Sequence, residues 1–328
     1  MTQKAKEILK YVLSLALAGV LVWFAVRSVD WKVFLKDLTL TRWGYVIPFL
    51  AASVGALVLR TTRWRDLLRS AGHDVGWLRV WDSHNVGNLA NVALPGSGEF
   101  IRCGYVVGKN GYGDAFGTAM MERAWDLVAV VVMIVLALLL DRDKFGPFFV
   151  EQIWTPLSGR LSFSLWWLVG LGVFIIVAAL WAVFRFRDSN RVCGKIAGAA
   201  SSVGRGFTSF LKLPRKGLFL LYTAGIWVMY LLMCYCILKA VPALGGLGME
   251  DALFFTAVGN IASVIPVPGG IGAYHYLVAL SVSSLYGGTW ETGLLFATLQ
   301  HELHAALVVL LGVVSYACLT LRSRNQRA

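Results

Sequence analysis

Two charged residues follow directly after a proline-glycine break in an otherwise apolar stretch, "NVALPGSGEFIRCG". Glu99 and Arg102 are three residues apart, so they would share one face of a helix that begins at the break. A helix N-terminus favours a carboxylate, and an arginine is a strong phosphate ligand. One interpretation makes Glu99 a gate or a contact for a cationic group and Arg102 a phosphate ligand. The other is a local ion pair that caps the helix.

A second charged group lies inside a long apolar run, "MMERAWDLVAV". Glu122 and Asp126 are four residues apart on one helical face, and Arg123 is adjacent to Glu122. Charges in a membrane helix are costly, face the protein interior and pair, so such residues are functional candidates by default. An ion-paired strut between helices is the structural alternative.

The third polar group stands in the last apolar run, "LQHELHAALVV", and comprises Gln300, His301, Glu302 and His304. The two histidines are three residues apart, unlike the four-residue spacing of the HExxH zinc motif, and no third ligand stands out. The spacing therefore predicts no metal site. A proton-responsive polar cluster is the functional interpretation.

Nearly the same sequence occurs twice: Val86–Val92 aligns with Val258–Val264, and each copy runs into a Pro-Gly break. Such self-similarity indicates a duplicated unit. After the second break, Tyr274 and His275 stand where the first copy has its charged pair, without a carboxylate. His275 could donate to a phosphate when protonated, or it could be a buried histidine bonded to backbone. We assign the following residues to the two breaks: Asn88, Pro95, Gly96, Gly98, Asn260, Pro268, Gly269, Gly270 and Gly272.

The composition is that of a membrane protein, since 58% of the 328 residues are apolar and only 15% are charged. The net charge of +12 would suit nucleic acid, but long uncharged runs exclude that architecture. A positive cytoplasmic membrane face explains it instead. The five cysteines show neither paired spacing nor a CxxC, so we expect no disulfide framework or zinc site.

We expect an all-α integral membrane protein with about six transmembrane helices and two re-entrant helical hairpins in an inverted repeat. The expected spans are 9–26, 43–61, 115–140, 161–184, 216–238 and 291–320. With both termini in the cytoplasm, 21 of the 30 lysines and arginines fall on that side, among them Arg60, Arg63 and Arg102. Three spans separate the two breaks, and an odd number inverts the second copy relative to the first.

This topology divides the chain into four parts. They are an N-terminal helix with an outer loop (1–42), a first repeat with its hairpin (43–140), a connecting helix with a basic cytoplasmic segment (141–215), and a second repeat with its hairpin and a short basic tail (216–328). Inverted repeats with helices broken near the membrane midplane are typical of transporters, whose sites lie at the breaks. Non-helical backbone at that depth must be buried or line a polar site.

The prolines would end the incoming half-helices and the glycines would allow the reversal, so that each outgoing half-helix directs free N–H groups toward an anion. The amides of Asn88 and Asn260 would satisfy carbonyls freed at the reversals, or contact a substrate. The substrate-binding candidates are Glu99, Arg102, Glu122, Arg123, Asp126, Tyr274 and His275.

At these residues the sequence resembles the lysylphosphatidylglycerol synthase transmembrane region, a flippase-like (YbhN-like) membrane family. The likeness rests on "NVALPGSGEFIRCG", on Glu122, Arg123 and Asp126, and on "PVPGGIGAYH". In bifunctional members this module precedes a soluble aminoacyl-transfer domain. The 328 residues hold no such domain, so the resemblance implies a non-enzymatic module at the inner membrane, associated with movement of a modified lipid between leaflets.

We therefore expect a lipid transporter without a cofactor, whose partners are an anionic or phosphate-bearing membrane lipid and a lipid-modifying enzyme, and not nucleic acid. No nucleotide-binding GxxxxGK[ST] motif is present. One alternative is an enzyme like the polyprenyl-diphosphate phosphatases, with Ser97 and Arg102 at the phosphoryl group. A membrane scaffold that does not transport is the other.

Overall fold

A computed structural model describes residues 30–94, 96–108, 111–155, 181, 185, 191–262 and 272–325, and all regular structure in these ranges is helical. The expected spans 9–26 and, but for one residue, 161–184 lie outside the described residues, as do Pro95, Pro268, Gly269 and Gly270. The fold expected from the sequence is therefore tested over the remaining four spans and most of both hairpins.

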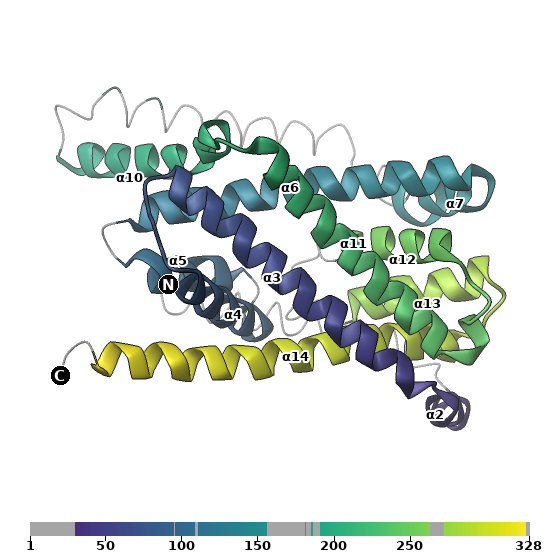
Figure 1. The fold of residues 1–328 in the computed structure, drawn as a ribbon. Coiled ribbons are helices and arrows are strands. Elements are labelled where there is room, and N and C mark those ends of the chain that lie inside the picture. The colour runs from purple at the N-terminus through teal and green to yellow at the C-terminus, as the bar shows by residue number, and fades with distance from the viewer. Residues whose placement is uncertain are drawn as a thin grey trace, which may run out of the picture.

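One order of helices occurs twice: a long helix, a hairpin of two shorter helices and a second long helix (Figure 1). The first set is α3 (Val46–Ser70), α4 (Trp77–Ala93), α5 (Ser97–Val107) and α6 (Tyr112–Leu140). The second set is α11 (Lys216–Ala240), α12 (Met249–Ala262), α13 (Ala273–Leu285) and α14 (Trp290–Asn325). The other elements are α2 (Trp31–Leu40), α7 (Arg142–Phe148), α10 (Arg191–Phe207) and the short turns Trp43–Tyr45, Phe149–Trp154, Thr208–Lys212 and Pro242–Leu244.

Four helical segments are long and apolar enough to cross a membrane, namely Trp43–Ser70, Tyr112–Leu140, Lys216–Ala240 and Trp290–Arg322. They coincide with four of the six expected spans. The first differs at its end, because the helix continues nine residues past the expected boundary at 61 until Gly72, at φ 95°, follows its C-cap. Arg60, at the expected cytoplasmic end of this span, and Arg63, expected just beyond it, therefore lie on one continuous helix.

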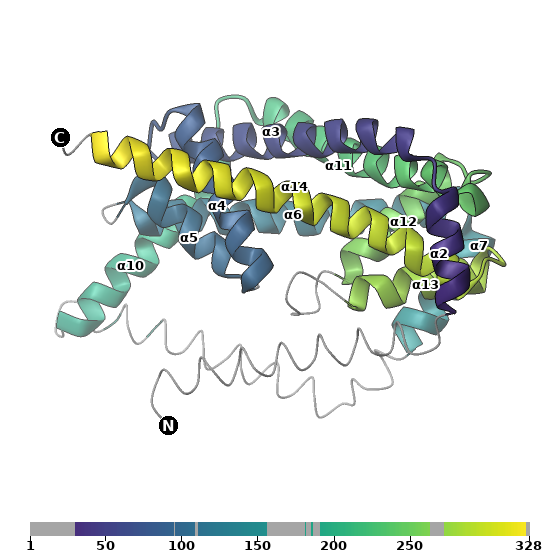
Figure 2. The same ribbon diagram turned by 90° about the horizontal axis from the view of Figure 1, so that it is seen from below.

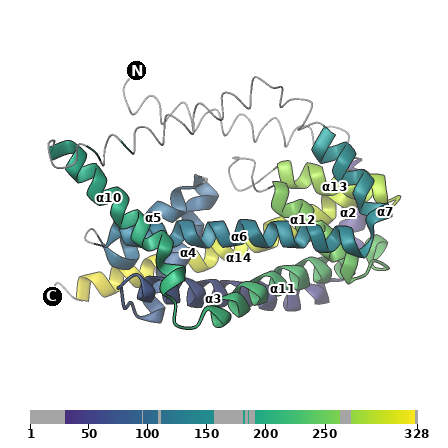
Figure 3. The same cartoon turned by 90° about the horizontal axis from the view of Figure 1, so that it is seen from above.

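The long helices α3 and α11 pack side by side in opposite directions (Figures 1 and 3). Where α3 begins and α11 ends, the backbone N–H of Arg42 donates to the carbonyl of Ala240 over 2.8 Å. The core between and beside them is aromatic and aliphatic, with Ile226, Phe254 and Phe296 fully buried. Outward-facing apolar residues such as Leu139 are exposed, as a lipid-facing surface requires.

The two hairpins lie at opposite ends of the molecule, and each packs on the last long helix of the other set (Figure 2). The α4–α5 hairpin lies beside α14, where Arg322 pairs with Asp82 over 2.7 Å. The α12–α13 hairpin lies beside α6 and α7, where Lys144 pairs with Asp251 over 2.8 Å. The hairpin of each half of the chain thus packs on a long helix of the other half.

Glycines allow the two helices of the first hairpin to approach closely. Gly96 begins α5 in the left-handed region, at φ 77°, and a β-carbon at Gly98 would overlap the carbonyl oxygen of Gly87. The amide that bridges this reversal belongs to Asn91: its Oδ1 accepts from the Gly98 N–H over 2.7 Å. The amides of Asn88 and Asn260 were expected to satisfy freed carbonyls or contact a substrate, whereas Asn91 satisfies a freed N–H at this reversal, and no hydrogen bond of Asn88 is found in the described part of the chain.

The second hairpin uses the corresponding positions differently. Gly272, at φ 90°, precedes α13, and Gly259 leaves room for the ring of Tyr274. The side chain of Asn260 donates to the Thr256 carbonyl of its own helix over 2.8 Å. Gly259 stands at the repeat position of Gly87, so both copies use this glycine for close packing within the hairpin.

Candidate functional site

A buried charged network joins α3, α5 and α6, and Arg63 is at its centre. This side chain is fully buried, and its guanidinium contacts Asp126 at 2.8 Å and Glu122 at 3.4 Å. It also donates to the Thr223 hydroxyl of α11 over 3.1 Å. Since an unpaired charge inside a membrane helix is costly, the two carboxylates of α6 are compensated by α3.

A second arginine of α3 completes the environment of Asp126. Arg60 contacts the other oxygen of Asp126 at 3.0 Å and donates to the Tyr230 hydroxyl over 2.6 Å. Both Asp126 oxygens are therefore held by arginines, one turn apart on the same helix. This arrangement ties the long helices α3, α6 and α11 together.

The expected pair on α5 reaches across to α6 instead of closing on itself. Arg102 lies 2.9 Å from Glu122 and 3.1 Å from Nδ1 of His84, with its guanidinium 4.2 Å from the centre of the Trp64 ring. Glu99 pairs with Arg123. The interpretation of Glu99 and Arg102 as a local ion pair that caps α5 is therefore wrong, because both partners lie on α6.

The network holds more positive than negative charge. Four guanidinium groups, from Arg60, Arg63, Arg102 and Arg123, face three carboxylates, from Glu99, Glu122 and Asp126. Three of the arginines are almost completely buried, whereas the side chain of Arg123 is 47% exposed. Arg123, which pairs with Glu99 at the start of α5, is thus the most accessible cation of the network.

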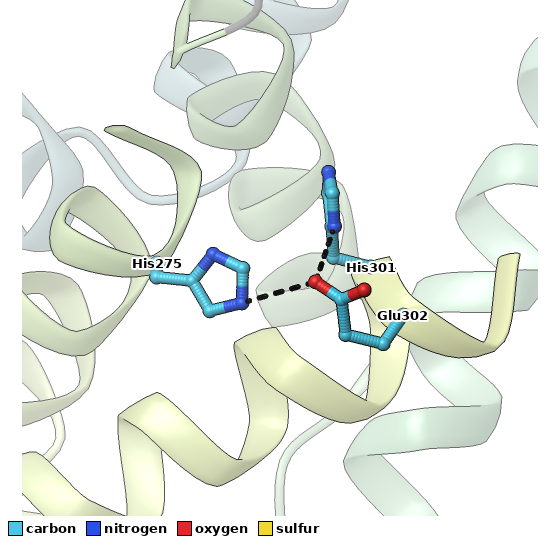
Figure 4. Close-up of side chains that lie close together, drawn as sticks. All are labelled: His275, His301 and Glu302. Carbon is cyan, nitrogen blue, oxygen red and sulfur yellow. Dashed lines mark hydrogen bonds and ion pairs between the residues drawn. The ribbon is translucent and has the colours of Figure 1, made fainter. Parts of the chain in front are cut away.

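A second polar cluster lies where α13 packs on α14. His275 of α13 and His301 of α14 both face one oxygen of Glu302, at 3.9 and 3.0 Å, as Figure 4 shows. The rings of the two histidines are 5.3 Å apart, and the Tyr274 ring lies 5.6 Å from that of His301. The two polar groups predicted on separate stretches thus form one cluster.

The other two members of the predicted polar group on α14 lie apart from this cluster. His304 Nδ1 forms a 2.6 Å hydrogen bond with the Ser53 hydroxyl of α3, so it joins two long helices. The buried Oε1 of Gln300 has no hydrogen-bond partner among the described residues.

Three members of the charged network, Arg60, Arg63 and His84, were not among the site residues predicted from the sequence. The stretch "RTTRWRDLLR" has the charge density of a loop, and we ended the span there for that reason. The spacing of this stretch nevertheless predicts a helix with a buried face. Arg60, Arg63, Trp64 and Leu67 follow the i, i+3, i+4, i+7 spacing of one helical face. Two arginines on the same helical face as apolar residues indicate that the arginines are buried.

Comparison with known proteins gives one family match, to the lysylphosphatidylglycerol synthase TM region, over residues 11–312. The chain belongs to this family. As a member of the lysylphosphatidylglycerol synthase transmembrane-region family with four long apolar helices in its described part, it is a multi-pass membrane protein.

A curated relative of this family member is a Haloferax volcanii protein named glycosyltransferase AglD. The two are 24% identical over 319 residues, which cover 83% of this chain and 49% of the relative. The chain thus spans about half the length of the relative. No solved structure matches the chain.

Proposed function

We propose that this protein moves a phosphate-bearing lipid between membrane leaflets, with Arg123 and its neighbours as the headgroup site. The observation that carries the proposal is a network with one guanidinium more than carboxylates, in which Arg123 is the most exposed cation. An arginine binds a phosphate bidentately. A phosphate at Arg123 would also bring the local charge to balance.

Glu99 is the group that such a phosphate would displace. It accepts from Arg123, and its other oxygen lies 3.4 Å from the Asn91 amide. Exchange of a carboxylate for a phosphate keeps the guanidinium paired throughout, so Arg123 is never left as a bare charge at membrane depth. Glu99 then acts as a gate whose release accompanies lipid entry.

The two hairpins would form the path along which the lipid headgroup crosses the membrane. We propose that α4–α5 and α12–α13 are re-entrant, that the two sets of helices form an inverted repeat of 43–140 and 216–328, and that both termini face the cytoplasm at the inner membrane. Both hairpin helices α4 and α12 are shorter than a span, at 17 and 14 residues. A lipid headgroup that passes between their tips would remain beside polar backbone and side chains.

The enzyme alternative gains no support from the candidate nucleophile. The Ser97 hydroxyl is 2.7 Å from the Leu94 carbonyl and 3.1 Å from the Ala90 carbonyl, in the geometry of a donor that closes the reversal. A phosphatase would need this hydroxyl beside a base. We assign Ser97 a structural role and place any lipid chemistry in a partner enzyme.

The test is lipid scrambling in proteoliposomes that contain a fluorescent phosphatidylglycerol, read as the fraction of label reached by a membrane-impermeant quencher. Wild-type protein should expose inner-leaflet label, and Arg123→Gln should lower the rate at least tenfold. Arg205→Gln is the matched control, because Arg205 is exposed to a similar degree (55%) but pairs with Asp114 of α6 outside the network. Wild-type vesicles that behave like empty ones would refute lipid movement, and equal rates for both variants would refute the headgroup site.

A further inference from the structure

The geometry points to a divalent metal site of the Zn²⁺ type formed by His275, His301 and Glu302, independent of the proposed lipid movement. Their ligand atoms, one from each side chain, all lie within 4.8 Å of one another. Two imidazoles and one carboxylate are a ligand set that binds zinc in proteins. We expected no metal from the sequence, because the last helix offers no third ligand at a suitable spacing. The third ligand, His275, comes from α13, the second helix of the α12–α13 hairpin.

The convergence of the three side chains is specific. His301 and Glu302 are neighbours on a helix and would ordinarily point about 100° apart. Here the Glu302 carboxylate instead turns one oxygen toward both imidazoles, 3.0 Å from His301 Nδ1 and 3.9 Å from His275 Nε2. Donors of a tetrahedral site with bonds of about 2.1 Å lie about 3.4 Å apart. The two carboxylate–imidazole separations bracket that value, and the two imidazole nitrogens lie within 4.8 Å of each other, so side-chain rotations would bring all three atoms to one ion (Figure 4).

The burial of the cluster favours a metal ion over a simple hydrogen-bonded pair. The His275 side chain is 9% exposed, and its second ring nitrogen, Nδ1, is buried without a partner among the described residues. The buried hydroxyl of Tyr274 has no partner there either. A zinc-bound histidine uses its second ring nitrogen for an outer partner, and Nδ1 of His275 is free among the described residues to bind one, such as a water. The side chain of Glu302 is 49% exposed, which leaves an approach for the ion and an open fourth position for water.

The other three histidines of the chain have different partners and do not belong to the proposed metal site. His304 is committed to Ser53, and His73 lies elsewhere, 3.4 Å from Asp114. His84 contacts Arg102, a cation that opposes metal binding. Of the five histidines in the sequence, two, His275 and His301, therefore share one carboxylate among the described residues.

The experiment uses full-length protein in detergent, purified through a tag that contains no histidine. After treatment with a chelator, Zn²⁺ is titrated by calorimetry, and Co²⁺ is titrated with its visible absorption as the readout of coordination geometry. Wild-type protein should bind one Zn²⁺ per chain and show the intense Co²⁺ bands of a four-coordinate site. His275→Ala, His301→Ala and Glu302→Gln should each raise the Kd at least about tenfold. His73→Ala is the control and should leave it unchanged.

Folding is checked separately for each variant by its elution as a single species and by its unfolding temperature in the absence of metal. For variants that pass this check, Zn²⁺ binding of unchanged stoichiometry and Kd would overturn the proposal. So would wild-type protein that takes up no Zn²⁺ at millimolar concentration, since the cluster would then be a hydrogen-bonded His-Glu pair. Should a variant fail to fold, the Co²⁺ spectrum of wild-type protein decides, because imidazole and carboxylate ligation changes the absorption of the aqueous ion.

Discussion

Arg102 of α5 and Glu122 of α6 form an ion pair of 2.9 Å in which both side chains are almost completely buried, at 5% and 1% exposure. The pair joins the hairpin to the long helix. Because Glu122 also contacts Arg63, it connects α5 to α3 through one carboxylate. A shift of the hairpin that moves Arg102 would therefore alter the contact between Glu122 and Arg63.

Glu122→Gln should destabilise the protein strongly. The substitution leaves Arg63 and Arg102 with one carboxylate fewer in a buried setting, and breaking such a pair costs about 3–5 kcal/mol. Unfolding in mixed micelles, followed by circular dichroism, measures the change. Asp74→Asn is the control, because Asp74 forms an exposed pair with Arg69 and its loss should leave the midpoint unchanged. Equal midpoints for Glu122→Gln and wild type would mean that the network contributes no stability.

Glu99→Gln should increase lipid retention. Glu99 competes with a phosphate for Arg123, so a neutral side chain there frees the guanidinium. Mass spectrometry of lipids that co-purify in detergent should show more anionic phospholipid on Glu99→Gln than on wild type, and less on Arg123→Gln. The two variants change in opposite directions only if the carboxylate and the lipid share one partner. A parallel loss in both would make Glu99 a direct ligand instead of a gate.

Gly98→Ala should disrupt the first hairpin, whereas Gly104→Ala should not. A β-carbon at Gly98 would overlap the Gly87 carbonyl and the Asn91 side chain, both close to the reversal. At Gly104 the nearest atom outside the helix backbone is 4.0 Å away, on Tyr112, and alanine favours the helix by about 0.5–1 kcal/mol. The unfolding temperature should therefore fall for the first variant and be equal or higher for the second. The reverse order would contradict the close packing of α4 on α5.

Cysteine labelling should place the two ends of the molecule on opposite sides of the membrane. Asp143 and Glu250 are exposed at the end that holds α7 and the start of α12, and Gly204 is exposed on α10 at the other end. In a cysteine-free background, Asp143→Cys and Glu250→Cys should react with an impermeant maleimide in intact cells. Gly204→Cys should react only after permeabilisation. The opposite pattern would invert the proposed orientation.

The long helices could be predicted from the sequence because an uncharged run of about 20 residues has few other structures available. The end of α3 could not, since Arg60 and Arg63 look like loop residues until α6 supplies their carboxylates. Residue types at the breaks also predicted the hairpin of α4 and α5. Asn91, whose amide bridges the reversal, was not among the predicted residues, because only the packing of α4 on α5 brings it against Gly98.

The pairing of the site residues depends on tertiary structure. Glu99 and Arg123 are 24 residues apart, on helices joined by a short connection, and nothing in their spacing specifies that they meet. The same holds for His275, whose neighbours on α14 are known only once α13 packs on that helix. The sequence therefore indicated which residues were candidates, and the packing of the hairpins determined which of them interact.

The packing of each hairpin on a long helix of the other half has a consequence for biosynthesis. The face of α4 that carries Asn85 is covered by Ser315 of α14, which follows 230 residues later. At about 5–20 residues per second, the ribosome needs roughly 10–50 s to make the missing helix. Throughout that interval the α4–α5 hairpin and its polar groups lack the cover that α14 provides. A chain truncated before α14 would lack this cover permanently.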